Sequence, residues 1–343
     1  MAKALGLNPG TLTCRRRIEA GPAYDTQPIR LMEEASMRLI TRSDFDGLAC
    51  AVLLKEVEKI DSIEFVHPKD VQSGSVAVGP DDILTNLPYD PKCGMWFDHH
   101  ASEATRGSIG KLRFRGRFAV APSAARVVYD HYVEQGRGKE LRKYKKLLET
   151  VDKSDSAQLT RRDIVSPKGW MLLSYVMDPR TGLGYQHHYA TSNKQLMAKM
   201  IEWIPKHTAA EILRKRDVAA RVKRYFEDQE EFKKLLRERS RLDGNVLISD
   251  LRGVAVPAGN RFLVYTLFPS CNVSVRVFDG KGGELAVFAV GHNVLNRTSK
   301  ADVGKLMAKF EGGGHKGAGA AQVPKATADA ALKKIVAALK RAG

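Results

Sequence analysis

The sequence predicts an α/β protein built on a parallel sheet with helices on both faces, followed by a second, smaller α/β domain. Short apolar stretches alternate with stretches of helical apolar spacing, a pattern typical of βαβ units. The chain has 343 residues, which suits two ordinary domains. Its residues are 43% hydrophobic and 28% charged, which indicates a globular protein with a full core and argues against disorder.

The first domain is expected over residues 37–205, where strand and helix patterns alternate. The apolar pattern predicts strands near 39–41, 63–66, 82–86 and 95–97, a loop at 43–47, a helix at 48–59 and largely helical segments at 122–150 and 168–240. Ligands of parallel sheets bind beyond the carboxyl ends of the strands. The polar residues that follow these strands are therefore candidates for a site.

The segments on either side of this domain differ from it. Residues 1–36 show no sustained periodicity and are predicted to be a flexible basic arm. Apolar spacing predicts a connecting helix within 206–244. A second domain is then expected over 245–343, with strands near 246–248, 262–265, 273–277 and 285–290 and helices from Ala301 and Thr327.

The charge of the chain is unusual, because 56 Lys and Arg against 39 Asp and Glu give a net charge of +17. Such an excess favours anionic partners such as phosphate, polyphosphate or nucleic acid, although a solvated basic surface would give the same count. No apolar run is long enough to span a bilayer, so no membrane partner is expected. The scattered cysteines form no CxxC pair and favour a reducing cytoplasm, and Cys50 is interpreted as a core residue.

Two polar clusters follow predicted strands. Asp44 and Asp46 lie two residues apart, so both carboxylates could face one cavity and bind Mn²⁺ or Mg²⁺, although helix capping is the structural alternative. Asp98-His99-His100 offers a metal ligand, a partner that orients an imidazole, and a proton donor or phosphate contact. A single histidine would more often be structural, but this triplet at a strand end is harder to explain in that way.

Other clusters lie further along the chain. Asp152 and Asp155 could bring another carboxylate to the same cavity or simply end a solvated helix. The run Gly312-Gly313-Gly314-His315 could let backbone N–H groups approach an anion, with a flexible glycine loop as the alternative. Arg180 could belong to a phosphate-facing loop, whereas His187 and His188 are interpreted as surface or packing residues.

Taken together, Asp-x-Asp-Gly, Asp-His-His and Gly-Gly-Gly-His resemble the DHH phosphoesterase superfamily with a C-terminal DHHA1 domain, over roughly residues 38–324. That superfamily includes exopolyphosphatases, oligoribonucleases, cyclic-dinucleotide phosphodiesterases and RecJ-type exonucleases. The resemblance implies a two-domain hydrolase of phosphodiester or phosphoanhydride bonds. It further implies a Mn²⁺-type or Mg²⁺-type dinuclear centre in the first domain and substrate binding by the second.

The resemblance also implies roles for individual residues. Metal ligands would come from Asp44, Asp46, Asn86, Asp98, His99 and Asp155, with Asp152 as the weaker match to the fourth motif. The catalytic set would be Asp98, His99 and His100, the last touching the scissile phosphate or assisting proton transfer. Substrate phosphate would be bound by Arg42, His100, Arg297, Gly312, Gly313, Gly314 and His315.

Two positions depart from the superfamily pattern. Arg42 stands where members carry a histidine, and Asn86 stands where they carry a bridging aspartate. Arginine cannot ligate a metal, and asparagine offers only a neutral carbonyl oxygen. We therefore expect one tight metal, with the second weak, absent or replaced by the guanidinium of Arg42, which could bind phosphate directly. His67 or Asp70 could supply a substitute ligand.

Two hypotheses follow from these patterns. The first is a metal-dependent phosphoesterase acting on polyphosphate or a short oligonucleotide. The second is a catalytically weakened DHH-type protein that binds a phosphorylated ligand or nucleic acid. A long nucleic acid is disfavoured, because no groove of interleaved aromatic and basic residues is recognisable. The sequence does not choose among polyphosphate, an oligoribonucleotide and a cyclic dinucleotide, and it allows a homodimer without requiring one.

Overall fold

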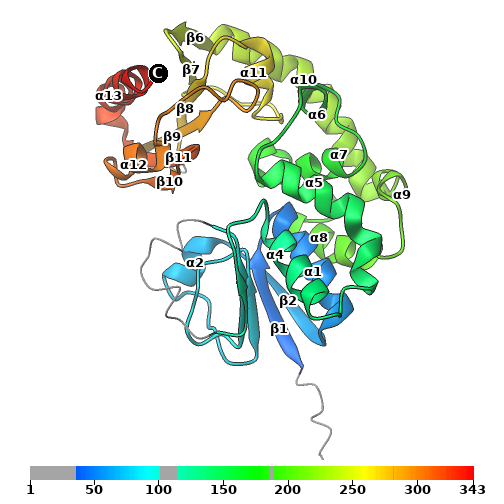
Figure 1. Ribbon diagram of the computed structural model, residues 1–343. Helices are drawn as coiled ribbons and strands as arrows, with labels where there is room; N and C mark the ends of the chain where they lie inside the picture. Colours follow the sequence, from blue (N-terminus) through cyan, green and yellow to red (C-terminus); the bar gives the residue numbers. More distant parts are fainter. Residues whose placement is uncertain (1–35, 101–113, 186–188, 281) are drawn as a thin grey trace, which may run out of the picture. The chain divides into compact units, whose positions relative to one another are not determined.

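The computed structural model describes residues 36–100, 114–185, 189–280 and 282–343 (Figure 1). These residues form two sheets and the helices around them. All but the last residue of the predicted basic arm, together with His187 and His188, lies outside the described residues.

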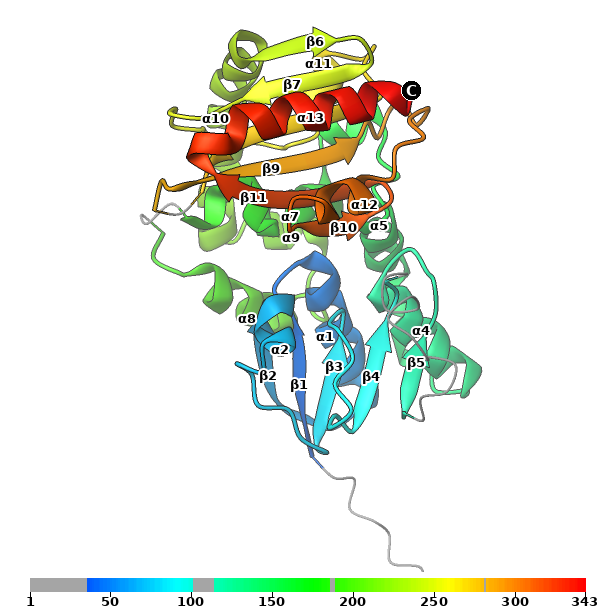
Figure 2. The ribbon, with the colours of Figure 1, turned by 90° about the vertical axis from the view of Figure 1, so that its left-hand side faces the viewer.

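The first sheet has five parallel strands in the order β2-β1-β3-β4-β5, which confirms the predicted parallel sheet. Figure 2 shows these strands side by side. They are β1 (Met37–Arg42), β2 (Ile60–Val66), β3 (Asp82–Thr85), β4 (Met95–Asp98) and β5 (Gly116–Phe118). Strand β2 lies beside one edge of β1, and β3 lies beside the other edge. The segments that follow β1 and β3 therefore run toward opposite edges of the sheet. Such a switch point is where open α/β sheets bind ligands.

Helices cover both faces of this sheet (Figure 1). Helices α1 (Phe45–Val57) and α4 (Ala124–Glu134) lie on one face and α2 (Pro68–Gln72) lies on the other. Because side chains of a strand alternate between faces, neighbouring residues join different cores. Leu39 packs in the core with α1, whereas Ile40 packs with Val71 of α2. Cys50 is fully buried in the α1 core, as expected.

A mostly helical segment separates the two sheets in the sequence. It contains η2 (Glu140–Tyr144), α5 (Lys145–Asp155), α6 (Arg161–Val165), α7 (Gly169–Met177), η3 (Pro179–Thr181), η4 (Leu183–Tyr185), α8 (Asn193–Trp203), α9 (Ala209–Leu213) and α10 (Arg216–Arg239). Within the part of the chain that the structure describes, no helix has the length and apolar character needed to cross a bilayer.

The second sheet is mixed and has six strands in the order β10-β11-β9-β8-β7-β6, with β7 and β8 parallel. Its strands are β6 (Ser240–Asp243), β7 (Val246–Asp250), β8 (Val273–Asp279), β9 (Leu285–His292), β10 (Gly313–His315) and β11 (Ala318–Pro324). Helices α12 (Val303–Ala308) and α13 (Ala328–Arg341) form a separate hydrophobic core with this sheet, and the short helix η5 (Lys325–Thr327) directly precedes α13. The predicted second α/β unit is thus present.

Two local predictions were wrong, and one alternative is excluded. Residues 262–265 were predicted as a strand, but helix α11 (Leu263–Leu267) begins there, because a four-residue apolar run does not distinguish the two states. The alternative of a flexible glycine loop is excluded, because the glycine-rich segment forms a hairpin of β10 and β11. Residues 43–47 are not a loop throughout, because α1 already begins at Phe45 with Asp44 as its N-cap.

Candidate metal centre

Asp46 lies in the first turn of α1 and is held by the start of α4. Its two carboxylate oxygens accept hydrogen bonds from the backbone N–H groups of Ala124 and Ala125, each at 2.8 Å. The side chain is almost fully buried. Burial raises the pKa of Asp46, and the nearby carboxylates of Asp155 and Asp44 raise it further. A cation at this position would relieve both effects.

His99 follows β4 and faces the same place. Its Nδ1 lies 3.0 Å from the carbonyl oxygen of Ala121, which can only accept, so Nδ1 carries a proton and Nε2 is the ring nitrogen left to bind a metal. Nε2 lies 3.3 Å from Asp155 Oδ2 and 3.8 Å from Asp46 Oδ2. Among the described residues this buried nitrogen has no hydrogen-bond partner.

Asp46, His99 and Asp155 therefore fit a divalent cation. One ligand atom of each lies within 4.8 Å of the others. In an octahedral site with bonds of about 2.1 Å, neighbouring ligand atoms lie about 3 Å apart, so only a small adjustment is needed. An imidazole nitrogen with two carboxylates suits Mn²⁺, and a buried nitrogen whose only fixed neighbours are carboxylate oxygens is the arrangement expected of a metal ligand.

The C-terminal end of α5 presents two aspartates, of which only Asp155 reaches this cluster. Desolvation raises the pKa of Asp155, while His99 opposes that rise. Asp152, one turn earlier, instead accepts hydrogen bonds from Ser123 Oγ at 2.7 Å and from Arg126 Nε at 3.0 Å. Asp152 therefore anchors the start of α4 and is not part of the three-residue cluster.

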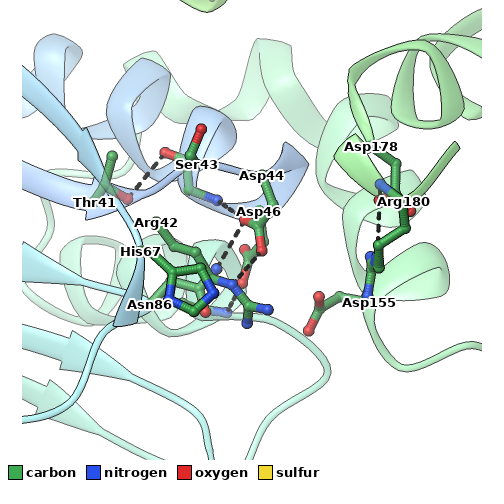
Figure 3. A network of polar contacts seen from close by, with 12 residues as sticks. Thr41, Arg42, Ser43, Asp44, Asp46, His67, Asn86, Asp155, Asp178 and Arg180 are labelled. Carbon is green, nitrogen blue, oxygen red and sulfur yellow. Dashed lines mark hydrogen bonds and ion pairs between the residues drawn. The ribbon is translucent and has the colours of Figure 1, made fainter. Parts of the chain in front are cut away.

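Asp44, the N-cap of α1, is already surrounded by donors (Figure 3). Its Oδ1 accepts the backbone N–H of Gly47 at 2.9 Å and Asn86 Nδ2 at 3.0 Å, and its Oδ2 pairs with Arg42 Nε at 2.9 Å. A Cβ at Gly47 would stand 2.0 Å from the carbonyl oxygen of Arg42, so only glycine allows this close turn.

Asp98 and His100 form a second group with His99, and here too the ligand atoms lie within 4.8 Å of one another. Asp98 Oδ1 accepts from His100 Nδ1 at 2.8 Å. The ring of His100 stacks on that of His315 from β10, with centroids 5.2 Å apart. Burial lowers the pKa of His315, and His100 lowers it further. The second sheet thus contributes an imidazole beside the Asp98–His100 pair.

The remaining predicted residues have other contacts. Arg297 donates to the carbonyl oxygens of Val294 and Ala157, the latter two residues beyond Asp155. Gly313 and Gly314 lie in β10 and Gly312 directly precedes it. His67 and Asp70 form a capping box that begins α2, so both are engaged in local structure.

Sequence reasoning missed Arg261, which pairs with Asp178 beside the cluster. It follows no strand and belongs to no motif, so no pattern in the sequence singles it out. Arg180, which had been singled out, pairs with the same carboxylate. A pocket lined in part by Asp46, Asp155, Arg180 and Arg261 joins these residues.

Comparison with known proteins shows to which family the chain belongs. No family model matches the chain, and no curated protein sequence matches it. A solved structure described as the pGpG-specific phosphodiesterase PggH from Vibrio cholerae is 40% identical, covers 90% of this chain and 100% of its own, and has a TM-score of 0.75. PggH is a DHH superfamily member. This chain belongs to the DHH phosphoesterase superfamily.

Two further structures resemble this DHH chain more weakly. An exopolyphosphatase-related protein from Bacteroides fragilis is 11% identical, with 90% of this chain and 92% of that chain covered and a TM-score of 0.49. RecJ from Thermus thermophilus, solved with Mn²⁺, is 13% identical, with 90% and 52% covered and a TM-score of 0.49. Both TM-scores are low, so the DHH assignment rests on the first similarity. The predicted α/β fold and DHH membership are thereby confirmed.

Proposed function

We propose that this DHH chain is a metal-dependent phosphodiesterase of short oligonucleotides and that a linear dinucleotide such as pGpG is its leading substrate. The observation that carries the proposal is the meeting of Asp46, Asp155 and His99, whose buried Nε2 has no hydrogen-bond partner among the described residues. The dinucleotide is taken from the 40% identical relative. Polyphosphate, which the sequence left open, becomes the less favoured substrate.

In this proposal Asp46, His99 and Asp155 hold one Mn²⁺ or Mg²⁺ ion. When bound, the ion supplies electrophilic catalysis by drawing charge from phosphate oxygens and by making water more acidic. The backbone N–H groups at the start of α4 keep Asp46 in place. The carbonyl of Ala121 keeps His99 in the tautomer that offers Nε2.

Arg42 takes the place of a second ion in the proposal. Its Nε is held by Asp44, and among the described residues no hydrogen bond of its two Nη groups is found. A guanidinium fixed in this way presents a planar fork that matches two phosphate oxygens. Arg42 would then neutralise charge on a phosphate bound beside this cluster.

His100 is the proposed proton donor to the leaving oxygen. Asp98 accepts from its Nδ1, which orients the ring and stabilises the protonated imidazole. The proton at Nε2 can then pass to the oxygen that leaves phosphorus. His315 stacks on the same ring, and we propose that it contacts the phosphate together with Gly312–Gly314 and Arg297.

The proposed division of labour follows the predicted domains. Residues 37–205 supply the metal ligands, residues 245–343 supply His315 and the glycine hairpin, and residues 206–244 connect them. We place the enzyme in the cytoplasm, as its cysteine usage predicts, and the reaction as proposed needs no second copy of the chain.

The test is a substrate panel. Metal-stripped protein receives Mn²⁺ or Mg²⁺ and is offered pGpG, cyclic diguanylate, polyphosphate and bis(p-nitrophenyl) phosphate, with released mononucleotide or phosphate measured. We expect turnover of pGpG that Asp98→Ala abolishes, whereas Asp217→Asn, a surface carboxylate paired with Lys199, serves as the unaffected control. Failure to hydrolyse any member with either metal would contradict the proposal.

The binding-protein hypothesis keeps one specific observation in its favour. Arg42 and Asn86 already satisfy Asp44, so a second ion has no ready carboxylate on that side. Tight pGpG binding without turnover, together with turnover gained in the double variant Arg42→His/Asn86→Asp, would support the binding role over the enzyme.

A further inference from the structure

One edge strand of the two sheets is longer than the others. Strand β2 has seven residues and pairs only with β1, at the outer end of the first sheet (Figure 2). The other edge strands are short, with three residues in β5, four in β6 and three in β10. A long open edge favours pairing with another chain, and short edge strands are a common protection against such pairing. Strand β2 lacks this protection.

The backbone of β2 has free hydrogen-bonding groups along this edge. Its pairing with β1 is regular from Ser62 to Val66. The carbonyl oxygen of Val66 accepts the N–H of Ser43 and therefore points toward the β1 side. Because the backbone groups of a strand alternate in direction, Ile63 and Phe65 direct theirs away from β1. Among the described residues no hydrogen bond to these outward groups is found.

A hollow of about 250 Å³ lies against the same edge. Ile63 and Phe65 contribute apolar surface to it from β2, and Ala198 and Ile201 contribute apolar surface from α8. Ile63 and Phe65 are only partly buried, because they pack at the margin of the core that contains α1. A chain that pairs with β2 would therefore also cover apolar side chains, which adds hydrophobic stabilisation to the backbone hydrogen bonds.

The charged residues of the hollow balance one another. Lys55 and Glu202 form an ion pair at 2.6 Å. Asp61 and Lys194 also line the hollow and are exposed, but within the described part of the chain neither has an ion pair. The hollow thus has no net charge, although the chain as a whole carries +17. Two copies of so basic a chain repel each other over most surfaces, and this balanced edge removes the repulsion.

Asp61 and Lys194 lie at opposite ends of the hollow. Glu202 in the last turn of α8 pairs with Lys55 in the last turn of α1. Because α1 ends just before β2 begins, this pair marks the end of the hollow at which Asp61 lies. Lys194 belongs to the first turn of α8 and therefore lies toward Phe65, at the other end of β2. The edge thus has a negative end and a positive end.

We propose that two copies of this chain associate through β2, with the two strands antiparallel and the first sheets of both copies joined into one. This two-fold arrangement brings Asp61 of each copy against Lys194 of the second copy. It also places Ile63 beside the same residue of the second copy, which closes both hollows. A register centred on Glu64 is disfavoured, because it would set two carboxylates directly opposite each other. None of the residues of the candidate metal centre lines the hollow, so this inference does not depend on the proposed function.

The test is sedimentation equilibrium of the full chain across the micromolar range, where the wild type should be a dimer. Asp61→Lys sets two ammonium groups against each other, so the Kd of the dimer should rise by at least about tenfold. Lys194→Asp sets two carboxylates against each other and should have a similar effect. The double variant Asp61→Lys/Lys194→Asp exchanges the two charges and should return the Kd to within about threefold of the wild type. Both side chains are exposed, so these changes leave the core intact.

Glu149→Lys is the matched control. Glu149 is also exposed and has no ion pair among the described residues, but it lies on α5 and does not line the hollow. The variant adds the same positive charge as Asp61→Lys and should leave the Kd of the dimer unchanged. Equal weakening in Glu149→Lys and Asp61→Lys would show that total charge rather than this edge controls association, and would overturn the proposal.

Hydrogen exchange of single amides tests the strand pairing itself. The N–H groups of Ile63 and Phe65 should exchange at least about tenfold more slowly in the dimeric wild type than in Asp61→Lys at a concentration where that variant is monomeric. Those of Ser62 and Glu64, which face β1, should be protected in both proteins. A dimer in which Ile63 and Phe65 exchange as fast as in the variant would place the interface elsewhere. A wild type that stays monomeric would leave this edge to a different occupant and overturn the proposal.

Discussion

Both sides of the candidate metal centre carry aspartates, but the surroundings of these carboxylates differ. On one side Asp46 and Asp155 lie close to His99, whose Nε2 has no hydrogen-bond partner among the described residues. On the other side Asp44 is satisfied by Arg42, Asn86 and the N–H of Gly47. Asp44 and Asp46, one from each side, both lie at the start of the same helix.

This difference shows that the neighbours of a carboxylate decide whether it is available to a metal. Burial and like charges raise the pKa of Asp46, so a cation would be strongly favoured there. Asp44 already has a guanidinium at 2.9 Å, and an incoming ion would have to displace it. We therefore expect the two sides to respond in opposite ways to substitution.

The largest expected effect is the loss of the ion in Asp46→Asn. An amide removes a charged ligand and places an NH₂ or a poorer acceptor against the N–H groups of Ala124 and Ala125. Loss of a partner that merely orients a ligand costs roughly 10–100-fold in metal affinity, so loss of the ligand itself should lower Mn²⁺ affinity by more than about a hundredfold, measured by calorimetry and by metal content after dialysis. Asp152→Asn is the control on the neighbouring helix, and it should change the affinity by no more than a few-fold. Comparable losses of Mn²⁺ affinity in the two variants would contradict the assignment of Asp46, and not Asp152, as a metal ligand.

The second prediction concerns the side of the centre that contains Asp44, where substitution should create a metal site. Arg42→His with Asn86→Asp removes the guanidinium and adds an imidazole and a carboxylate around Asp44. The number of Mn²⁺ ions bound per chain should rise from one to two, as measured by elemental analysis. Each single variant should remain at one ion. A wild type that already binds two ions tightly would show that Arg42 does not block the second site.

The third prediction concerns Asp178, a carboxylate that, like Asp44, is paired with arginine. Asp178→Asn leaves Arg180 and Arg261 without their shared partner and should lower the free energy of unfolding by about 3 kcal/mol near pH 7. The pKa of Asp178 is lower in the folded than in the unfolded protein. The ionised carboxylate therefore stabilises the fold at pH values above its unfolded pKa, and this stabilisation fades as the pH falls below about 4.

Denaturant titrations of the wild type and Asp178→Asn at several pH values check this. The difference in unfolding free energy between the two proteins should shrink as the solution is acidified. A difference that is independent of pH between about 3 and 7 would show that the loss comes from packing rather than from charge.

The smallest expected effect is that of Ser123→Ala. Ser123 Oγ accepts the N–H of Arg126 at 3.0 Å as the N-cap of α4 and donates to Asp152. Its loss should cost about 1 kcal/mol of stability. Because the start of α4 also holds Asp46, Mn²⁺ affinity should fall by a few-fold, far less than in Asp46→Asn. An unchanged affinity would show that Asp46 is positioned without help from this cap.

Much of the fold followed from local patterns. The apolar runs before Arg42 and before Asp98 predicted parallel strands, and the polar residues at their ends did lie at one edge of the sheet. The strand predicted at 262–265 failed, because a short apolar run buried by tertiary packing has no period of its own. The roles of the site residues stay predictions until the variants above are measured.

By itself, the sequence determined the α/β class, the parallel sheet and the motifs that identify a DHH phosphoesterase, because these depend on short-range periodicity and spacing. The motif match already favoured Asp155 over Asp152, but only the tertiary structure gave Asp152 its own role, since the packing of α5 against α4 turns Asp155 toward His99 and Asp152 toward Ser123. The pairing of Arg261 with Asp178 likewise appeared only in three dimensions. Contacts between residues so far apart in the chain depend on how whole elements pack, which no local pattern encodes.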